Sequence, residues 1–220
     1  MKNIVILFFF ITLISCSSNK NIISNKENNT IEIHNIYKIY PSTLKLSLMS
    51  EYSQKHYGYP NYSLVNPQII VVHSTETRNL QIALNVFQND FLVGRKDIDS
   101  GGDVNVGTHF LVDTNGTIYA STPLEYMARH TIGLNYTAIS IENIGFAGKL
   151  TKEQLNANIK LIKYLKNHYK SIKYVIGHYE YRNTNSPHYH LFREIDPTYR
   201  FTIKTDPGYD FMQEIKQRIH

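Results

Sequence analysis

Two histidines and one aspartate are placed where a folded chain could gather them around a metal ion. His73 directly follows the apolar run IIVV (69–72), and His178 directly follows YVIG (174–177). Both runs are typical of strands, and a sheet commonly presents its ligand-facing side chains at the edge where its strands end. Asp206 lies in the segment KTDPG, whose proline and glycine predict a turn that presents the carboxylate. Two histidines, one aspartate and an open position match the three-ligand plan of a catalytic zinc ion.

An acid and a cation accompany these three residues. The segment TAISIENIG (137–145) predicts a strand in which Ala138, Ser140 and Glu142 share one face. A carboxylate at the end of such a small-residue face has room in front of it, and we expect it to have a hydrogen-bond or charge partner because a buried unpaired acid is costly. Glu142 and Lys204 would then supply the acid/base group and the positive charge of a metal-assisted reaction. Taken alone, His73 is explained equally well as a core histidine.

The elements that must position these residues are readable from local patterns. Residues 79–90 predict an amphipathic helix with Ile82, Leu84, Val86 and Phe87 on its buried side. Residues 104–121 predict a hairpin that turns at an Asn-Gly pair. Thr151, with a glutamine three residues later, predicts the start of a helix through a capping box.

Length and composition limit the possible classes of protein. A chain of 220 residues suits one domain with a proper core, and its net charge of +5 without a Lys/Arg block gives no support for nucleic-acid binding. The chain has 17 tyrosines and no tryptophan, which favours a wet groove as much as a core. Cys16 is the only cysteine, so the rest of the chain has no disulfide, no thiol nucleophile and no cysteine metal ligand.

The first residues predict export. Residues 1–15 hold a twelve-residue apolar run after Lys2, which is too short to cross a bilayer and fits a signal peptide. The run ends in LISC, which resembles a lipobox and makes Cys16 the expected lipidated first residue of the mature protein, although an ordinary cleavable signal or an N-terminal anchor is the alternative. A lipid-anchored envelope protein follows, and Ser17 after the cysteine favours the outer membrane.

Three further parts complete the expected organisation. Residues 16–40 are polar and Asn-rich and predict a flexible tether. Residues 41–66 predict an extension packed on the domain, with the alternating Leu44, Leu46 and Leu48 in a short strand. Residues 67–220 form the expected catalytic domain, with an insertion at 179–203.

Six motifs between Pro67 and Phe211 resemble, in order, those of zinc-dependent N-acetylmuramoyl-L-alanine amidases of the type 2 and peptidoglycan-recognition family. They are IIVVHST, VGTHFLVDTNGTIY, ARHTIG, SIENIG, IGHYE and KTDPGYDF. The resemblance implies an α/β fold: a central mixed β-sheet flanked by helices on both faces, with a cleft along the strand-end edge. It also implies peptidoglycan or muropeptides as the partner.

The resemblance assigns roles residue by residue. His73, His178 and Asp206 would bind one Zn²⁺ ion, and the aspartate is the third ligand because some relatives use a cysteine that this chain lacks. Glu142 would orient and deprotonate the attacking water, and Lys204 would stabilise the oxyanion. The segments holding Thr75, His109 and His130 match positions near the substrate, although a structural role for either of these two histidines is an equal alternative. The implied reaction is hydrolysis of the amide between N-acetylmuramic acid and the L-alanine of the stem peptide.

Two departures from the family pattern bear on this assignment. The gap between His178 and Lys204 is longer than usual, and the inserted residues 179–203 form a groove wall or surface decoration. His188 and His190 within them are alternative metal ligands, because they would point the same way on an extended chain. Arg129 stands where relatives often have a tryptophan, which removes a sugar-stacking contact.

Two other functions remain open from sequence. A peptidoglycan-binding lipoprotein without catalytic activity could use the same fold, and so could a surface adhesin. The intact ligand set favours the hydrolase over both. The sequence predicts no particular oligomeric state.

Overall fold

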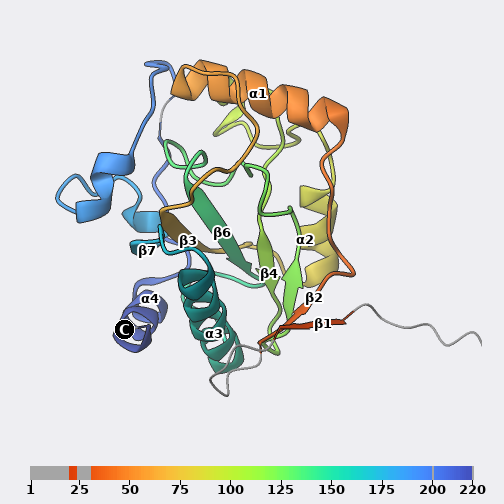
Figure 1. The fold of residues 1–220 in the computed structure, drawn as a ribbon, viewed down its shortest axis with the longest axis vertical. Coiled ribbons are helices and arrows are strands. Elements are labelled where there is room, and N and C mark those ends of the chain that lie inside the picture. The colour runs from red at the N-terminus through yellow and green to blue at the C-terminus, as the bar shows by residue number, and fades with distance from the viewer. Residues whose placement is uncertain (1–19, 24–30, 200, 220) are drawn as a thin grey trace, which may run out of the picture.

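The computed structural model describes residues 20–23, 31–199 and 201–219 (Figure 1). The predicted signal peptide, residues 1–15, and Cys16 lie outside these residues. Among the helices that are described, none combines the length and the apolar character needed to cross a membrane.

Within the described residues, seven strands form one mixed sheet in the order β1-β2-β5-β4-β6-β3-β7. The pairs β1·β2 and β4·β5 are antiparallel, and the neighbours β4, β6, β3 and β7 are parallel. The strands are β1 (Lys20–Ile23), β2 (Ile31–His34), β3 (Ile69–Ser74), β4 (Phe110–Val112), β5 (Ile118–Ala120), β6 (Ala138–Asn143) and β7 (Tyr174–Gly177). The expected α/β class with a central mixed sheet is confirmed.

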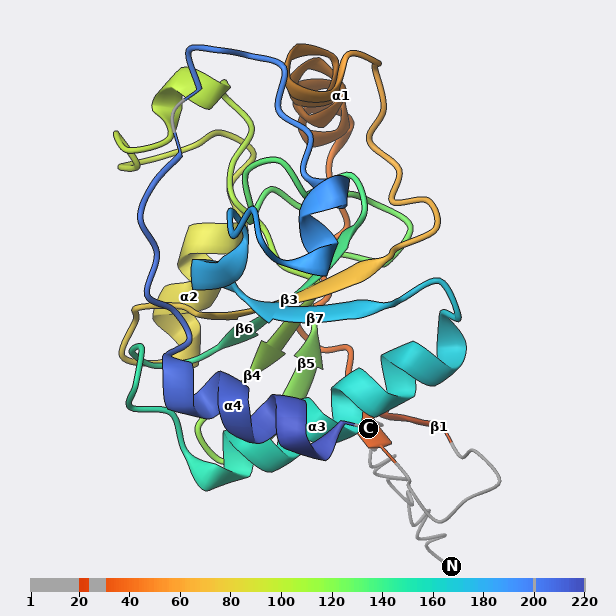
Figure 2. The same ribbon diagram turned by 90° about the vertical axis from the view of Figure 1, so that its left-hand side faces the viewer.

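Helices cover both faces of this sheet, as Figure 2 shows. In that view α3 and α4 lie below the sheet, and α1 and α2 lie on its other side. The helices are α1 (Thr43–Tyr57), α2 (Leu80–Phe87), α3 (Lys152–His168) and α4 (Tyr209–Arg218), with short 3-10 helices η1 (Asp99–Gly101), η2 (His178–Glu180) and η3 (Pro187–Leu191).

Strand β3 is the centre of the core. All six of its residues are buried, because β6 and β7 flank it and helices cover both faces. Its β-branched run suits a strand that is apolar on both sides. The pairing places His73 of β3 level with Glu142 of β6, and Val72 level with Gly177 of β7.

Two elements predicted from local sequence patterns are confirmed. The Thr151 hydroxyl accepts from the backbone N–H of Gln154, whose side-chain oxygen accepts from the N–H of Thr151 at 2.9 Å, which is the predicted capping box of α3. The predicted hairpin is formed by β4 and β5, and Gly116 takes the positive φ of 83° that its turn requires.

The strand predicted around Leu44–Leu48 is wrong, because these residues lie in helix α1. The buried side of α1 includes Lys45, Ser53 and His56 besides its apolar residues, so the helical period is hidden in a polar-rich stripe. Ser42 caps the helix by accepting from the N–H of Lys45, and Gly58 ends it with a φ of 81°. The helix packs on the domain through Leu48, Met49, Tyr52 and Tyr57.

Two smaller predictions are also corrected. The flexible tether predicted over residues 16–40 is wrong at β2, which pairs with β5 and buries Ile31 and Ile33 in the core. The alternation of these two isoleucines was missed because the residues around them are polar. Helix α2 buries Ala83, Leu84 and Phe87, whereas Ile82 and Val86 are about 40% exposed.

Candidate metal centre

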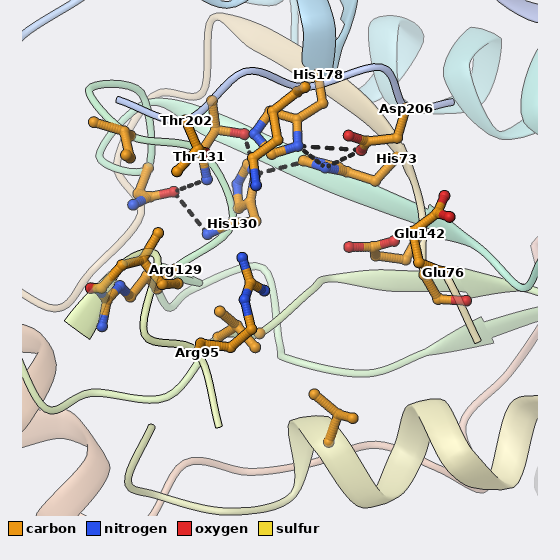
Figure 3. A pocket seen from close by; sticks show the side chains of 18 of the residues that line it. His73, Glu76, Arg95, Arg129, His130, Thr131, Glu142, His178, Thr202 and Asp206 are labelled. Atoms are coloured by element: carbon orange, nitrogen blue, oxygen red, sulfur yellow. Dashed lines mark hydrogen bonds and ion pairs between the residues drawn. The ribbon is translucent and has the colours of Figure 1, made fainter. Parts of the chain in front are cut away.

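The structure brings His73, His178 and Asp206 together although they are far apart in the sequence (Figure 3). The Nδ1 atoms of the two histidines are 3.0 Å apart. The Asp206 Oδ2 atom lies 3.3 Å from Nδ1 of His73 and 3.1 Å from Nδ1 of His178. All three residues are buried. Three donor atoms therefore converge on one point.

The sheet produces this convergence directly. Because β3 is paired in parallel with β6 on one side and β7 on the other, the ends of all three strands meet at one edge. His73 lies in register with Glu142, and His178 follows Gly177, the partner of Val72. Neighbouring residues in register point to the same face of a sheet, so both histidines and the glutamate share one site.

The loop before α4 supplies the aspartate. The carbonyl oxygen of Asp206 accepts from the N–H of Tyr179, which ties this loop to η2 beside His178. Gly208 has a φ of 109°, and the carbonyl of the preceding Pro207 accepts from the N–H of Gly148. These contacts hold the carboxylate against the two imidazoles.

Burial and charge set the protonation of the three residues. Burial alone would raise the pKa of Asp206, but the adjacent His178 and His73 outweigh it and hold that pKa below its usual range. Burial, and secondly His73, lowers the pKa of His178 to about 4. At neutral pH the site therefore offers an ionised carboxylate and a neutral imidazole, which are the forms that bind metal.

Glu142 faces the same space without a partner for one oxygen. Its Oε2 atom is buried and has no hydrogen bond, so the expected partner is missing for that atom. Burial raises the pKa of Glu142 to about 7. A half-buried carboxylate that lines the same cavity as three candidate ligands, and has one buried oxygen without a hydrogen bond, fits a group that handles a proton at the site.

Lys204 and Arg95 line the same cavity, and both lie near the carboxylate of Asp97. The Nζ atom of Lys204 lies 3.9 Å from Oδ2 of Asp97. The guanidinium of Arg95 donates one hydrogen bond to each oxygen of the same carboxylate, at 2.8 Å to Oδ1 and 2.7 Å to Oδ2. Burial, and secondly the charge of Arg95, lowers the pKa of Lys204. Arg95 and Asp97 were not predicted from sequence, because they lie in a loop with no pattern linking them to the strand ends.

These groups share a cavity of about 380 Å³. The predicted residues on its wall are His73, Thr75, His130, Glu142, His178, Lys204 and Asp206. Tyr52 of α1 and Tyr199 of the insertion also contribute to the wall. The insertion at 179–203 is therefore a wall of this cavity, one of the two roles expected for it.

His109 does not reach the cavity. It is fully buried, its Nε2 donates to the carbonyl of Tyr126 at 3.1 Å, and its Nδ1 accepts from the N–H of Ser140 at 3.0 Å. Burial lowers its pKa to about 4, so it stays neutral. One ring nitrogen bonds to β6 and the other to the link between β5 and β6, so His109 has the structural role that was considered as its alternative.

His188 and His190 do not replace Asp206, so that alternative is wrong. They lie in η3 and not on an extended chain. His188 donates to the carbonyl of Glu180, and His190 bonds to the carbonyl of Pro187. Among the described residues the only cluster that could hold a metal is His73, His178 and Asp206.

Arg129 is buried, and its guanidinium hydrogen-bonds to neighbouring parts of the same chain. Its guanidinium donates to the carbonyls of Ile98, Gly102 and Val104 and to the hydroxyl of Tyr199. The residue that stands in place of the family's tryptophan thus organises the loop that follows Arg95.

The donor set fits zinc. Two imidazole nitrogens and one carboxylate oxygen are ligands that zinc prefers, and three protein ligands leave one position open. Glu142, whose Oε2 atom has no hydrogen-bond partner, lines the same cavity as these three residues.

Comparisons with solved structures place the fold among known proteins. A selenomethionine derivative of AmpD is 16% identical over 84% of this chain and 96% of its own, with a TM-score of 0.53, and shows the same fold. The N-acetylmuramoyl-L-alanine amidase LysC from Clostridium intestinale URNW is 27% identical over 57% of this chain and 83% of its own, with a TM-score of 0.41. Bumblebee PGRP-SA is 27% identical over 58% and 78%, with a TM-score of 0.42.

None of the curated proteins compared with the chain matches it significantly. A family model for N-acetylmuramoyl-L-alanine amidase matches residues 63–208, well over half of the chain. The chain therefore belongs to the N-acetylmuramoyl-L-alanine amidase family, whose members act on peptidoglycan.

Proposed function

We propose that the protein is a zinc-dependent N-acetylmuramoyl-L-alanine amidase that binds one Zn²⁺ ion and hydrolyses the amide between N-acetylmuramic acid and the L-alanine of the stem peptide. One observation carries the proposal. His73, His178 and Asp206 converge in a cavity where the unpartnered carboxylate oxygen of Glu142 and the amine of Lys204 are also found. Family membership supplies the substrate class.

The protein's own residues have distinct roles. His73, His178 and Asp206 would hold zinc, which when bound acts as a Lewis acid on the carbonyl and activates water. Glu142 takes a proton from the attacking water and passes it to the amine nitrogen as the amide bond breaks. Its raised pKa of about 7 suits both steps near neutral pH. Lys204 donates to the carbonyl oxygen as negative charge develops there.

The cavity suits recognition of a small part of a large polymer. Its volume of about 380 Å³ lies in the range of small-molecule sites and admits the atoms around one amide bond. Tyr52 and Tyr199 provide rings with polar tips on its wall. Soluble muropeptides are therefore suitable test substrates.

The experiment compares muropeptide cleavage and metal content in three proteins. The zinc-loaded wild type should release stem peptide from a muropeptide. Glu142→Gln should abolish release, because the amide cannot accept a proton, while zinc content stays at one ion per chain. Glu214→Gln, which changes an exposed glutamate of α4, should leave both properties unchanged.

Two results would contradict the proposal. Undiminished release by Glu142→Gln would remove the assigned proton acceptor. A wild type that binds zinc and muropeptide but releases no stem peptide would favour the peptidoglycan-binding lipoprotein without catalysis.

We also propose that Cys16 is lipidated and anchors the exported protein to the cell envelope, with the outer membrane favoured by Ser17. The sequence LISC after the apolar run supports this. Labelling with a fatty-acid analogue should mark the wild type but not Cys16→Ala, and the variant should leave the membrane fraction. An unlabelled wild type would contradict the anchor.

A further inference from the structure

His73 uses both nitrogens of its ring. Its Nδ1 atom faces His178 and Asp206, and its Nε2 atom lies 3.2 Å from Nδ1 of His130. The rings of His73 and His130 meet edge to face, at an interplanar angle of 89°. Figure 3 shows His130 on the side of His73 away from Asp206, coming from the link between β5 and β6.

A hydrogen bond between two imidazoles requires a proton on one nitrogen and a lone pair on the other. The Nε2 atom of His130 faces the carbonyl oxygen of Ala138 at 3.5 Å. A carbonyl oxygen only accepts, so His130 carries its proton on Nε2 and has a lone pair on Nδ1. The hydroxyl of Thr131, 2.9 Å from that Nδ1 atom, is able to donate to the same lone pair. The proton between the two rings therefore belongs to His73.

We propose that His130 is a positioning residue that fixes His73 as its Nε2–H tautomer and so keeps the Nδ1 lone pair available to zinc. This inference rests on the proposed zinc site but not on the amidase reaction. A ligating histidine commonly donates its second N–H to an oxygen acceptor, and here the acceptor is another histidine.

The backbone of His73 is held separately. The side-chain amide of Asn143 donates to the His73 carbonyl at 3.0 Å, and Asn158 donates to the side-chain oxygen of Asn143. These bonds fix the position of the His73 backbone, but they do not restrict rotation of its side chain. The hydrogen bond to His130 determines the rotation and the tautomer.

Zinc affinity gives the first test. The full chain competes with a chromophoric chelator for zinc, without any substrate. His130→Leu removes the acceptor and should weaken zinc binding by about ten- to a hundredfold. His130→Asn places a side-chain oxygen near the position of Nδ1 and should stay within about threefold of the wild type. His190→Leu, at an exposed histidine outside the cavity, should change nothing.

A spectroscopic test separates positioning from general support of the fold. In the zinc-loaded, ¹⁵N-labelled wild type, the proton should show its one-bond coupling to Nε2 of His73. A coupling across the hydrogen bond should connect it to Nδ1 of His130. In His130→Leu the cross-bond coupling should disappear and the Nε2–H should exchange faster with water.

Three outcomes would overturn the inference: unchanged zinc affinity in a folded His130→Leu, a proton bonded to Nδ1 of His130, or a wild type that takes up no zinc. The second is measured on the wild type, so it decides even if His130→Leu fails to fold. A chain that cleaves no muropeptide but loses zinc affinity in His130→Leu would contradict only the proposed amidase activity.

Discussion

His73 and Glu142 are register partners on the adjacent parallel strands β3 and β6. The imidazole of His73 and the half-buried carboxylate of Glu142 therefore point to the same face, one strand apart. Because each of these strands is paired with a neighbour on both sides, their spacing depends on backbone hydrogen bonds within the sheet. The residues that would bind zinc and move the proton therefore lie on adjacent, hydrogen-bonded strands of the sheet.

Zinc should stabilise the folded protein. At a free zinc concentration a hundred times the dissociation constant, binding adds about 2.7 kcal/mol, which for a domain of this size raises Tm by about 5 to 10 °C. Thermal unfolding with zinc and with EDTA measures the shift. Asp206→Asn should abolish it, and an equal shift in this variant would mean that zinc does not bind at this site.

The contribution of Glu142 to the stability of the zinc-free protein should fall as pH rises from about 4.5 to 7. Glu142 keeps its proton up to a pKa of about 7 when folded, because it is buried, whereas the ordinary value is 4.5. The unfolded state therefore ionises first, and the free energy of unfolding decreases across this window. Glu142→Gln removes the effect and should gain about 3 kcal/mol relative to wild type between pH 4.5 and 7.5.

Urea unfolding in EDTA at several pH values measures this difference. Glu214→Gln, at an exposed position, should track the wild type at every pH. A constant difference between Glu142→Gln and wild type would show that Glu142 does not hold a proton in the folded state.

Lys204→Met should separate turnover from metal binding. The side chain lines the cavity but is not one of the three candidate ligands. Turnover should fall by about a hundred- to a thousandfold, as for loss of one oxyanion donor, while zinc affinity stays within about threefold. Lys149→Met, at an exposed lysine, is the matched control. Undiminished muropeptide cleavage would rule out the assigned role.

Gly208→Ala should disturb the loop that carries Asp206. A Cβ atom at Gly208 would lie 2.7 Å from the backbone N of Gly148, and the φ of 109° disfavours any side chain. We expect a loss of about 3 kcal/mol in the free energy of unfolding, together with weaker zinc binding. Gly102→Ala has nearly the same φ, 108°, but open space around the new Cβ, so it should cost only about 1 kcal/mol. Equal costs in urea unfolding would contradict the steric argument.

Arg129→Met should destabilise the loop around η1. It leaves the carbonyls of Ile98, Gly102 and Val104 without their guanidinium donor, at a cost of about 3 kcal/mol in urea unfolding. Arg129→Lys should recover only part of this loss, because an ammonium cannot reproduce the planar fork. Arg78→Met, at an exposed arginine, should cost less than about 0.5 kcal/mol. A loss that small for Arg129→Met would show that the hydrogen bonds contribute little.

Local sequence signals determined the elements that lie closest to the site. A β-branched run gives β3, the Thr151–Gln154 pair gives the start of α3, and a glycine gives the hairpin turn, because each depends on backbone preferences and caps within a few residues. The same short segments identified the three candidate ligands and Glu142. Helix α1 was not predicted, because its buried side contains polar residues whose hydrogen-bond partners lie in distant parts of the sequence. His56, for example, bonds to Glu194 and to the carbonyl of Gly101.

Only the tertiary structure decided which side chains meet. The pairing of β3 with both β6 and β7 joins segments about 70 and 105 residues apart, and no local pattern encodes that register. In the folded protein His130 contacts His73, whereas His109 bonds to the carbonyl of Tyr126 and lies outside the cavity. Arg95 and Tyr199, which no sequence pattern links to the strand ends, line the cavity. Residue types and spacing name the groups that can bind a metal, but burial and strand register, which arise from the whole chain, determine where their atoms converge.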